Sequence, residues 1–574
     1  MTCLRFPLML TLTGALISVG LAPAQPPASG IPSISVRPPE QLRFRTTALN
    51  NLGWRLGTRS DAFGTATFRE AAIKADAATL PTLEGVSTNL DYNLSPTDVA
   101  KVKTTLEELR LHMPAYRVAS LPADEATRRR ILLFAKSLGA DMVITPAESG
   151  ALAELDKLAN ETGMNISVVT AKPAALMPAL AAQSKRLGLH VNTASTSLAN
   201  LTLLKDRVFS VSIAPGTKNL PQFLTQFSRV QPTTIQPNWP PTTDGGAKKS
   251  ELKPLFISLQ PTPGKDPVAD LTTAAAAYDN DVRPAIAWRI DTLSRLSTIS
   301  TPGNLAPEIR QKIDAAIPRQ ALAHPQKIRK LLVMDLCVNG GYYHATIPQG
   351  NLAVELIGKY TGAYSTVFSN DINNLRYPAI KQFDAVFLNN VEGEIFIDPA
   401  VMSGLLRYVR EGGGVGGLHA ATWASVDVPE YGELMGSQTG AHKYNGEAGT
   451  IRVEVPGTPL TAHFVSPSFD VIDEFYHFLP DGPYSRDKLR VLISLDPKKT
   501  TLSGNQYTTR PDNDYGMVWI RSLGKGRVFN CALGHRPDFY QNPEMEKLLL
   551  GGIQFILGDL AADTTPSAKL PQKK

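Results

Sequence analysis

Histidine is the residue type whose placement in this sequence points most clearly to chemistry. Of the nine histidines, six lie between residues 344 and 535: His344, His419, His442, His463, His477 and His535. A neutral imidazole can accept a proton or bind a metal ion near neutral pH. Imidazoles that meet at one place would therefore support general acid–base catalysis or metal binding.

Two of these histidines stand where an open α/β sheet binds its ligands. His419 ends the run "GVGGLH" and His535 ends "VFNCALGH", and both runs have the apolar pattern of buried strands. Ligands of such sheets bind beyond the carboxyl ends of the parallel strands. We therefore predict that His419 and His535 face one site, one as a base and the other as an acid. In many α/β enzymes the corner occupied here by His419 carries a Ser or Cys nucleophile.

The segment "FDVIDEFYHF" supplies a carboxylate and a phenol to the same region. Side chains alternate between the two faces of a strand, so Glu474 and Tyr476 share one face. Asp473, Phe475 and His477 then lie on the other face. We predict that Glu474 orients an imidazole or a water molecule, and that Tyr476 donates a hydrogen bond to a substrate oxygen.

Three further residues are candidates for substrate binding. His442 lies in the glycine-rich loop "TGAHKYNG", which is suited to covering a site. Trp423 in "HAATW" follows the same strand as His419, and His344 in "GGYYHAT" follows the first strand of the second domain. His344 and His463, the latter in "PLTAHF", are weaker candidates, because a structural role in a loop is as common for such histidines.

A divalent metal ion held by His419, His535 and Glu474 is an alternative interpretation of the same residues. No H-x-x-x-H or H-x-H pair supports it. Whether a cofactor or metal is bound therefore stays open at the level of the sequence.

The composition is that of an ordinary globular protein with more than one domain. The chain has 574 residues, of which 43% are hydrophobic and 19% charged, and its formal net charge is +6. This length exceeds what one hydrophobic core usually organises. Lys and Arg are scattered, with no basic stripe, so nucleic acid is not an expected partner.

The N-terminus has the pattern of an export signal. In residues 1–24, Arg5 precedes the apolar run "FPLMLTLTGALISVGL", and the small residues "APA" stand before Gln25. The run is too short to span a bilayer. We expect a periplasmic or secreted mature protein without a membrane anchor, with residues 25–40 as a linker.

The rest of the chain alternates strands and helices, which predicts an α/β protein with two domains. Residues 41–300 contain eight strand-plus-helix units, the pattern of a (β/α)8 TIM barrel, with the first strand expected at residues 43–50. The remaining ranges are a linker at 301–326, an open doubly wound, flavodoxin-like domain at 327–560, and a disordered tail at 561–574. Within the second domain, a helix is expected at 398–411, with Asp398 as its N-terminal cap, and a more β-rich insertion after residue 446.

The second domain resembles the trehalose-utilisation (ThuA-like) family. The matching motifs are "NGGYYH", "GGGVGGLHAATW", "YGELMGSQTGAH", "DEFYHF" and "YGMVWIRSLGKGRVFNCALGH", in that order. The resemblance implies a fold similar to class I glutamine amidotransferases and a role in carbohydrate catabolism, including routes through 3-keto-sugars. Those amidotransferases carry a Cys at the corner where this chain has His419, so amidotransferase chemistry is excluded.

The barrel more weakly resembles xylose-isomerase-like sugar phosphate isomerases and epimerases, through "FAKSLGADMVITPAE" and "LLKDRVFSVSIAPG". Where such enzymes place several metal ligands at strand ends, only Glu148 is a candidate here. One carboxylate does not hold a catalytic divalent ion, so we expect the barrel to lack metal chemistry.

Together these observations favour an exported carbohydrate-metabolism protein that acts on a glycoside or 3-keto-sugar through its second domain. The reaction would be a hydrolysis, a lysis or an isomerisation. The alternative is a non-catalytic carbohydrate-binding protein, with pockets lined by aromatic residues such as Trp423, Tyr444, Tyr476 and Trp519.

Overall fold

The computed structural model describes residues 52–230, 255–338, 341–442, 446–500 and 510–570. The predicted export signal, the linker at 25–40 and the expected first strand at 43–50 lie outside the described residues. No helix in the described ranges combines the length and the apolar character needed to cross a bilayer.

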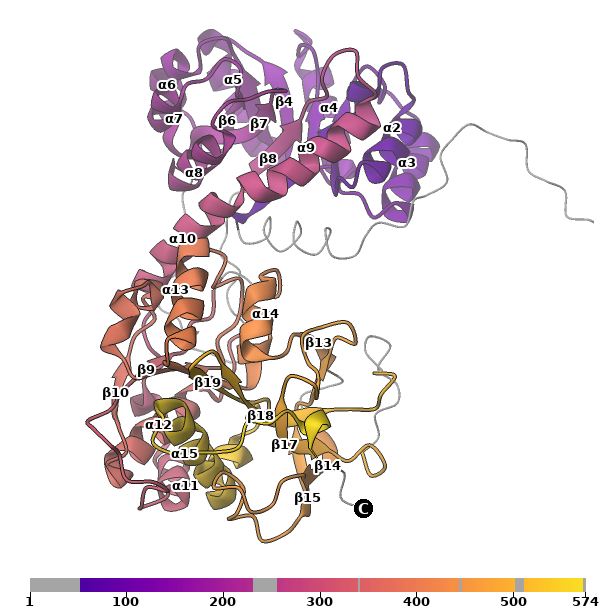
Figure 1. Ribbon diagram of the computed structural model, residues 1–574. Helices are drawn as coiled ribbons and strands as arrows, with labels where there is room; N and C mark the ends of the chain where they lie inside the picture. Colours follow the sequence, from indigo (N-terminus) through magenta and orange to yellow (C-terminus); the bar gives the residue numbers. More distant parts are fainter. Residues whose placement is uncertain (1–51, 231–254, 339–340, 443–445, 501–509, 571–574) are drawn as a thin grey trace, which may run out of the picture. The chain divides into compact units, whose positions relative to one another are not determined.

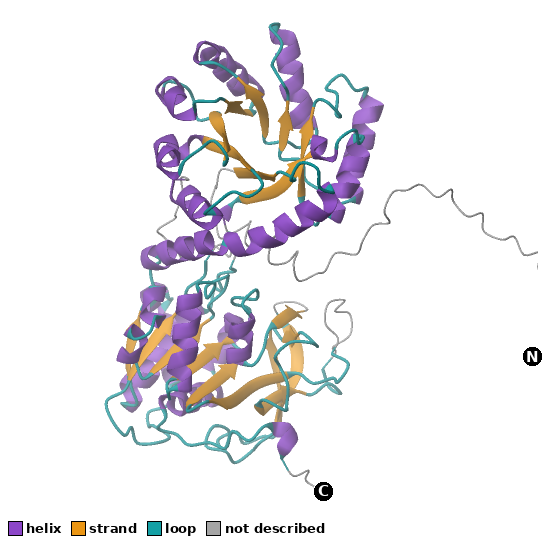
Figure 2. Ribbon diagram, turned by 45° about the horizontal axis from the view of Figure 1, so that its top comes forward, coloured by secondary structure: helices purple, strands orange, loops and turns teal. Residues whose placement is uncertain are grey.

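The N-terminal part is a closed barrel of eight parallel strands, as the alternation predicted (Figures 1 and 2). The first of them begins later than expected, at Trp54. The strands are β1 Trp54–Arg59, β2 Thr82–Val86, β3 Ala115–Arg117, β4 Met142–Pro146, β5 Asn165–Val169, β6 Leu187–Asn192, β7 Val208–Ile213 and β8 Leu255–Leu259.

Helices surround the barrel strands, and Figure 2 shows them as an outer ring. They are α2 Phe68–Ala77, α3 Pro96–Glu108, α4 Glu125–Ser137, α5 Leu152–Thr162, α6 Pro173–Ala181, α7 Leu198–Leu204, α8 Leu220–Val230, α9 Pro267–Asp281 and α10 Arg283–Leu296. Helix α4 shows why they form: Asp124 accepts a hydrogen bond from the Thr127 N–H at 2.8 Å, and Ile131, Leu132 and Phe134 are buried. An N-terminal cap and one apolar stripe are what an amphipathic helix needs.

The C-terminal domain is built on one nine-stranded sheet in the order β10-β9-β11-β12-β19-β18-β17-β14-β15. The pairs from β10 to β19 in that order are parallel, and the pairs from β19 to β15 are antiparallel. The strands are β9 Lys330–Met334, β10 Ser365–Phe368, β11 Ala385–Asn389, β12 Gly414–Leu418, β14 Glu447–Val453, β15 Ser468–Asp473, β17 Arg490–Leu495, β18 Gly516–Leu523 and β19 Gly526–Cys531.

The sheet is therefore mixed, and only its parallel half is the doubly wound sheet that the sequence predicted. The predicted β-rich insertion after residue 446 supplies the antiparallel half. It also supplies one strand of a separate pair, β13 Thr439–His442 with β16 Tyr476–Phe478.

Helices cover both faces of the parallel half, as Figure 1 shows. On one face α12 Ile347–Thr361 and α15 Pro543–Leu557 pack together, and on the other face lie α13 Pro399–Arg410 and α14 Pro429–Met435. Helix α13 begins as its sequence predicted, since the Asp398 side chain accepts a hydrogen bond from the Ala400 N–H at 2.8 Å.

Two segments differ from their sequence expectation. Residues 301–326 contain helix α11 Pro307–Ala316, whose Ile313 joins the apolar core formed by α12 and α15. In the tail expected to be disordered, the Ser567 N–H donates to the Leu489 carbonyl at 2.9 Å, and Ser567 Oγ accepts from the Val491 N–H at 2.9 Å. These bonds satisfy backbone groups next to β17, an effect that composition alone does not reveal.

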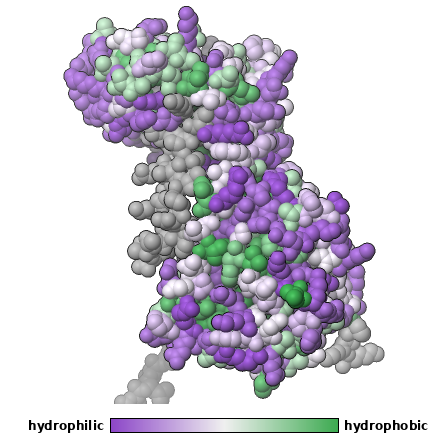
Figure 3. All heavy atoms as spheres, turned by 90° about the vertical axis from the view of Figure 1, so that its left-hand side faces the viewer, coloured by the Kyte–Doolittle hydropathy of each residue, from purple (hydrophilic) through white to green (hydrophobic). Residues whose placement is uncertain are grey.

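The surface is mainly polar. In Figure 3 hydrophilic residues dominate the visible face, and hydrophobic side chains gather in a few separate patches. The most exposed large hydrophobic residues described are Ile328 and Val465, and each is more than 90% exposed. Isolated exposed apolar side chains of this kind are normal on a folded protein.

Candidate active site

His419 is placed by a sharp backbone turn at the carboxyl end of β12. Its φ is +47°, a left-handed conformation that is rare for residues other than glycine, and its side chain is fully buried. Gly417, two residues before it, is closely packed, since an added Cβ would lie 2.5 Å from Met435 Cε and 2.6 Å from Asn530 Oδ1, and both side chains would have to shift. The turn directs the imidazole out of the sheet, as the corresponding corner does for a nucleophile in other α/β enzymes.

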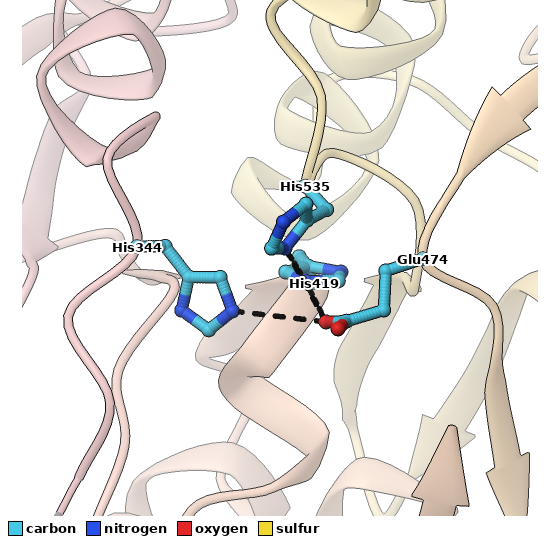
Figure 4. Close-up of side chains that lie close together, drawn as sticks. All are labelled: His344, His419, Glu474 and His535. Carbon is cyan, nitrogen blue, oxygen red and sulfur yellow. Dashed lines mark hydrogen bonds and ion pairs between the residues drawn. The ribbon is translucent and has the colours of Figure 1, made fainter. Parts of the chain in front are cut away.

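The tautomer of His419 follows from its hydrogen bond to the backbone. Its Nδ1 lies 3.1 Å from the carbonyl oxygen of Ala532. A carbonyl oxygen can only accept, so Nδ1 carries a proton and Nε2 is the nitrogen that faces the centre of the site. Figure 4 shows this ring among His344, Glu474 and His535.

Glu474 stands between β15 and β16 and is the carboxylate around which the histidines gather. Its Oε2 lies 3.1 Å from His419 Nε2 and 3.3 Å from His535 Nδ1, while His344 Nε2 is 3.9 Å away. Its Oε1 lies 2.9 Å from His442 Nδ1. Burial alone would raise the pKa of Glu474, but the four surrounding histidines outweigh it and hold this pKa far below the usual range.

His344 lies in the centre of this group rather than at its rim. It is 3% exposed, and burial lowers its pKa to about 3, so the ring is neutral at physiological pH. Its Nε2 faces Glu474, and its Nδ1 lies 3.8 Å from Glu392 Oε2. The sequence suggested only a substrate-binding residue here, because nothing in "GGYYHAT" shows which side chains it will meet.

Tyr476, His442 and Trp423 form an aromatic wall beside the cluster. The Tyr476 hydroxyl oxygen lies 3.0 Å from His419 Nε2, and the two rings stack at a centroid distance of 4.4 Å. The Trp423 ring lies 5.7 Å from the His442 ring and 5.6 Å from the Tyr476 ring. His442 is 36% exposed at its side chain, and the contact with Glu474 raises its pKa.

The donor set fits a divalent transition-metal ion. One ligand atom from each of His344, His419, Glu474 and His535 can be chosen so that all lie within 4.8 Å of one another. His419 Nε2 lies 3.1 Å from a carboxylate oxygen of Glu474 and 3.3 Å from Nδ1 of His535. A proton or a metal ion can join such atoms, and a set of three nitrogens with one oxygen suits Zn²⁺ or a similar ion.

The ligands come from four separate segments, after β9, β12, β15 and β19. The set contains the two histidines and the carboxylate of the metal alternative drawn from the sequence, and it adds His344. No local spacing could have revealed it, because the sheet brings the segments together.

A buried carboxylate that the sequence did not single out lies behind His344. Glu392 is 9% exposed, and burial raises its pKa to about 8. Its backbone forms a β-bridge with Cys337, which extends the pairing of β9 and β11. The only signal in the sequence was its place just beyond the end of an apolar strand.

Other candidates lie away from this site. His463 Nε2 donates to the Glu544 carbonyl oxygen at 2.8 Å, and Trp519 is fully buried, with its indole N–H donating to Met435 O at 2.9 Å. Tyr444 lies outside the described residues. A pocket lined by Trp519, as the binding-protein alternative suggested, is therefore not formed.

The barrel interior has a different polar arrangement. Glu84 and Arg117 form an ion pair there, and His190 Nδ1 lies 2.8 Å from Ser210 Oγ. Glu148, the one metal-ligand candidate of the barrel, is exposed at the end of β4. Within the described residues, the only group of metal-ligand type is the one in the C-terminal domain.

Comparison with known protein families gives a match within the C-terminal domain. Residues 334–556 match the family model ThuA, described as trehalose utilisation. The C-terminal domain is thus similar to the ThuA family over these residues. No curated protein matches the chain.

Several solved structures are similar to this chain at low sequence identity. A ThuA-like protein from Bacteroides uniformis is 19% identical, covering 43% of this chain and 99% of its own, with a TM-score of 0.35. A xylose isomerase-like TIM barrel protein from Mycobacterium smegmatis is 11% identical, covering 41% of this chain and 98% of its own, with a TM-score of 0.32. A xylose isomerase domain protein from Alicyclobacillus acidocaldarius is 12% identical, covering 40% and 99%, with a TM-score of 0.30.

Proposed function

We propose that the ThuA domain is a metal-dependent enzyme that acts on a glycoside or 3-keto-sugar by hydrolysis, lysis or isomerisation. The observation that carries this proposal is the convergence of three imidazoles on the buried carboxylate of Glu474. One ligand atom from each of four side chains lies within 4.8 Å of the others, and such convergence of imidazoles and a carboxylate is the arrangement of a metal-ligand set.

In this proposal His344, His419, His535 and Glu474 hold the ion. A bound divalent ion would polarise a sugar carbonyl or hydroxyl oxygen, or lower the pKa of a water molecule. This assignment changes the roles expected from the sequence, since His419 and His535 hold the ion instead of moving protons. The proton-transfer roles pass to the residues of the aromatic wall.

His442 and Tyr476 are suited to these roles. Because His442 Nδ1 is engaged by Glu474, its other nitrogen is left at the partly exposed edge of the site, where it can exchange a proton with a substrate. The Tyr476 hydroxyl lies 3.0 Å from His419 Nε2 and can donate a hydrogen bond to an oxygen bound at the centre.

Aromatic side chains at the rim suit a sugar as the substrate. Trp423 lies beside His442, and Tyr342 is 45% exposed with its ring 4.8 Å from the ring of His344. Ring faces beside hydrogen-bonding groups bind the alternating apolar and polar surfaces of a sugar.

The test is metal analysis of the purified protein, followed by NMR of reactions with ordinary and 3-keto disaccharides. We expect one equivalent of a divalent metal and a product, both lost in His419→Ala. His463→Ala, which removes a histidine outside the site, serves as the matched control and should behave as the wild type. A His419→Ala protein that is folded and still turns over substrate would overturn the proposal.

We also propose that the protein is exported and functions in the periplasm or outside the cell, on the strength of the signal pattern in residues 1–24. Mass spectrometry of the mature protein from its native host should find Gln25 at the N-terminus. An intact Met1 in a cytoplasmic fraction would contradict this.

A further inference from the structure

The turn that follows β19, residues 532–536, touches every segment that carries a member of the ligand cluster. It carries His535 itself. At its start, the Ala532 carbonyl accepts the hydrogen bond from His419 Nδ1 at 3.1 Å. This bond fixes which nitrogen of His419 faces the site, and it sets the plane of the ring.

Asp473 connects the turn to Glu474. Its Oδ2 accepts the Gly534 N–H at 2.8 Å, and its Oδ1 accepts the N–H groups of Arg536 at 3.1 Å and Glu474 at 2.9 Å. The side chain is 3% exposed. The buried carboxylate of Asp473 thus links the backbone on both sides of His535 to the backbone N–H of Glu474, which directly follows Asp473 in the sequence.

Thr346 connects the turn to the segment of His344. Its hydroxyl donates to the Gly534 carbonyl at 3.2 Å, and the Tyr540 hydroxyl donates to the same oxygen at 2.8 Å. Gly534 has a φ of +120°, a conformation in which only glycine is unstrained. Both backbone groups of Gly534 are therefore used to hold neighbouring segments.

We propose that the 532–536 turn is a positioning hub that presets the four ligands before a metal ion binds, with Asp473 and Thr346 as its positioning residues. The inference rests on the proposed metal site. Asp473 lies next to a ligand in sequence and is buried like one, but all three of its hydrogen bonds go to backbone N–H groups. It therefore orders the ligands instead of joining them.

The test compares Co²⁺ binding to the wild type, Thr346→Val and Thr346→Ser by titration and visible absorption, which reports ligand geometry. Valine has the shape of threonine without its hydroxyl, and serine keeps the hydroxyl. We expect Thr346→Val to bind Co²⁺ about 10- to 100-fold more weakly, the usual loss when a residue that orients a ligand is removed, and its absorption bands to shift. Thr346→Ser should restore both.

Thr361→Val is the matched control. It removes a hydroxyl that donates to a carbonyl, Ile357 O at 2.6 Å, at the far end of the same helix. Thermal unfolding separates lost stability from lost positioning. Should Thr346→Val not fold, Tyr540→Phe removes the other hydroxyl from the Gly534 carbonyl and takes its place.

Two results are distinguishable. Wild-type protein that binds no Co²⁺ would overturn the metal site itself. Wild type and Thr346→Val that bind Co²⁺ with equal affinity and identical spectra would overturn the hub and leave the metal site standing.

Discussion

Replacing Glu474 by glutamine removes one negative charge from the centre of the candidate site and almost nothing else. The side chain is nearly fully buried, and its two oxygens face His442 on one side and His419 and His535 on the other. Glutamine has the same shape and keeps one acceptor oxygen. Any change therefore reports the charge.

The size of the effect follows from the burial. Removing one partner of a buried charge pair typically costs about 3–5 kcal/mol, because the other charge is left uncompensated. Since about 1.4 kcal/mol corresponds to a tenfold change in binding, we expect affinity for a divalent ion to fall roughly 10²- to 10⁴-fold. Turnover should fall with it at any metal concentration that does not saturate the variant.

Competition of Zn²⁺ between the protein and a chromophoric chelator measures this affinity directly. The exchange Glu433→Gln serves as the control, because Glu433 is exposed, lies outside the ligand cluster and pairs with Lys488 at 3.2 Å. Exposed pairs of this kind contribute about 0–1 kcal/mol, so the control should bind Zn²⁺ as the wild type does. A folded Glu474→Gln protein with wild-type Zn²⁺ affinity would show that the carboxylate is not a ligand.

Three further predictions concern stability and can be checked by chemical or thermal unfolding. Burial raises the pKa of Glu546 well above its ordinary value of 4.5. As pH rises above 4.5, the free energy of unfolding of the wild type should therefore fall by about 1.4 kcal/mol per pH unit relative to that of Glu546→Gln. A difference that stays constant with pH would refute this. Gly414→Ala should destabilise by about 3 kcal/mol, because an added Cβ would lie 2.0 Å from the Ile556 carbonyl; an unchanged melting temperature would contradict that packing. Arg117→Met should destabilise by about 3–5 kcal/mol by leaving the fully buried Glu84 unpaired, and adding Glu84→Gln should recover most of the loss.

Local patterns predicted the barrel and the parallel half of the second sheet well, because hydrophobic periodicity and capping residues act over a few neighbours. Asp398 at the start of α13 is such a case. The antiparallel half of the sheet was foreseen only as a β-rich insertion, since pairing depends on contacts far apart in sequence. The same reason explains helix α11 and the ordered Ser567, whose partners lie in other elements.

The part of the candidate site that depends on the positions of strand ends could be predicted from the sequence. His419 and His535 follow adjacent parallel strands, β12 and β19, so their proximity follows from the rule that ligands bind beyond carboxyl ends. Alternation also placed Glu474 and Tyr476 on one side. The central position of His344 and the backbone role of Asp473 depend on loop conformation, which no periodicity encodes.

The conformation of the chain at His419 explains how an imidazole can stand at a corner where many α/β enzymes place a smaller nucleophile. The left-handed backbone costs of order 1–3 kcal/mol for a residue with a side chain, and such strain persists only where the surroundings fix it. Here the Ala532 carbonyl fixes one ring nitrogen, and Tyr476 stacks on the ring. The strained turn thus holds Nε2 in one position. Three other ligand atoms meet at that position, and a metal ion is bound more tightly by ligands that are already fixed there than by ligands that must first be ordered.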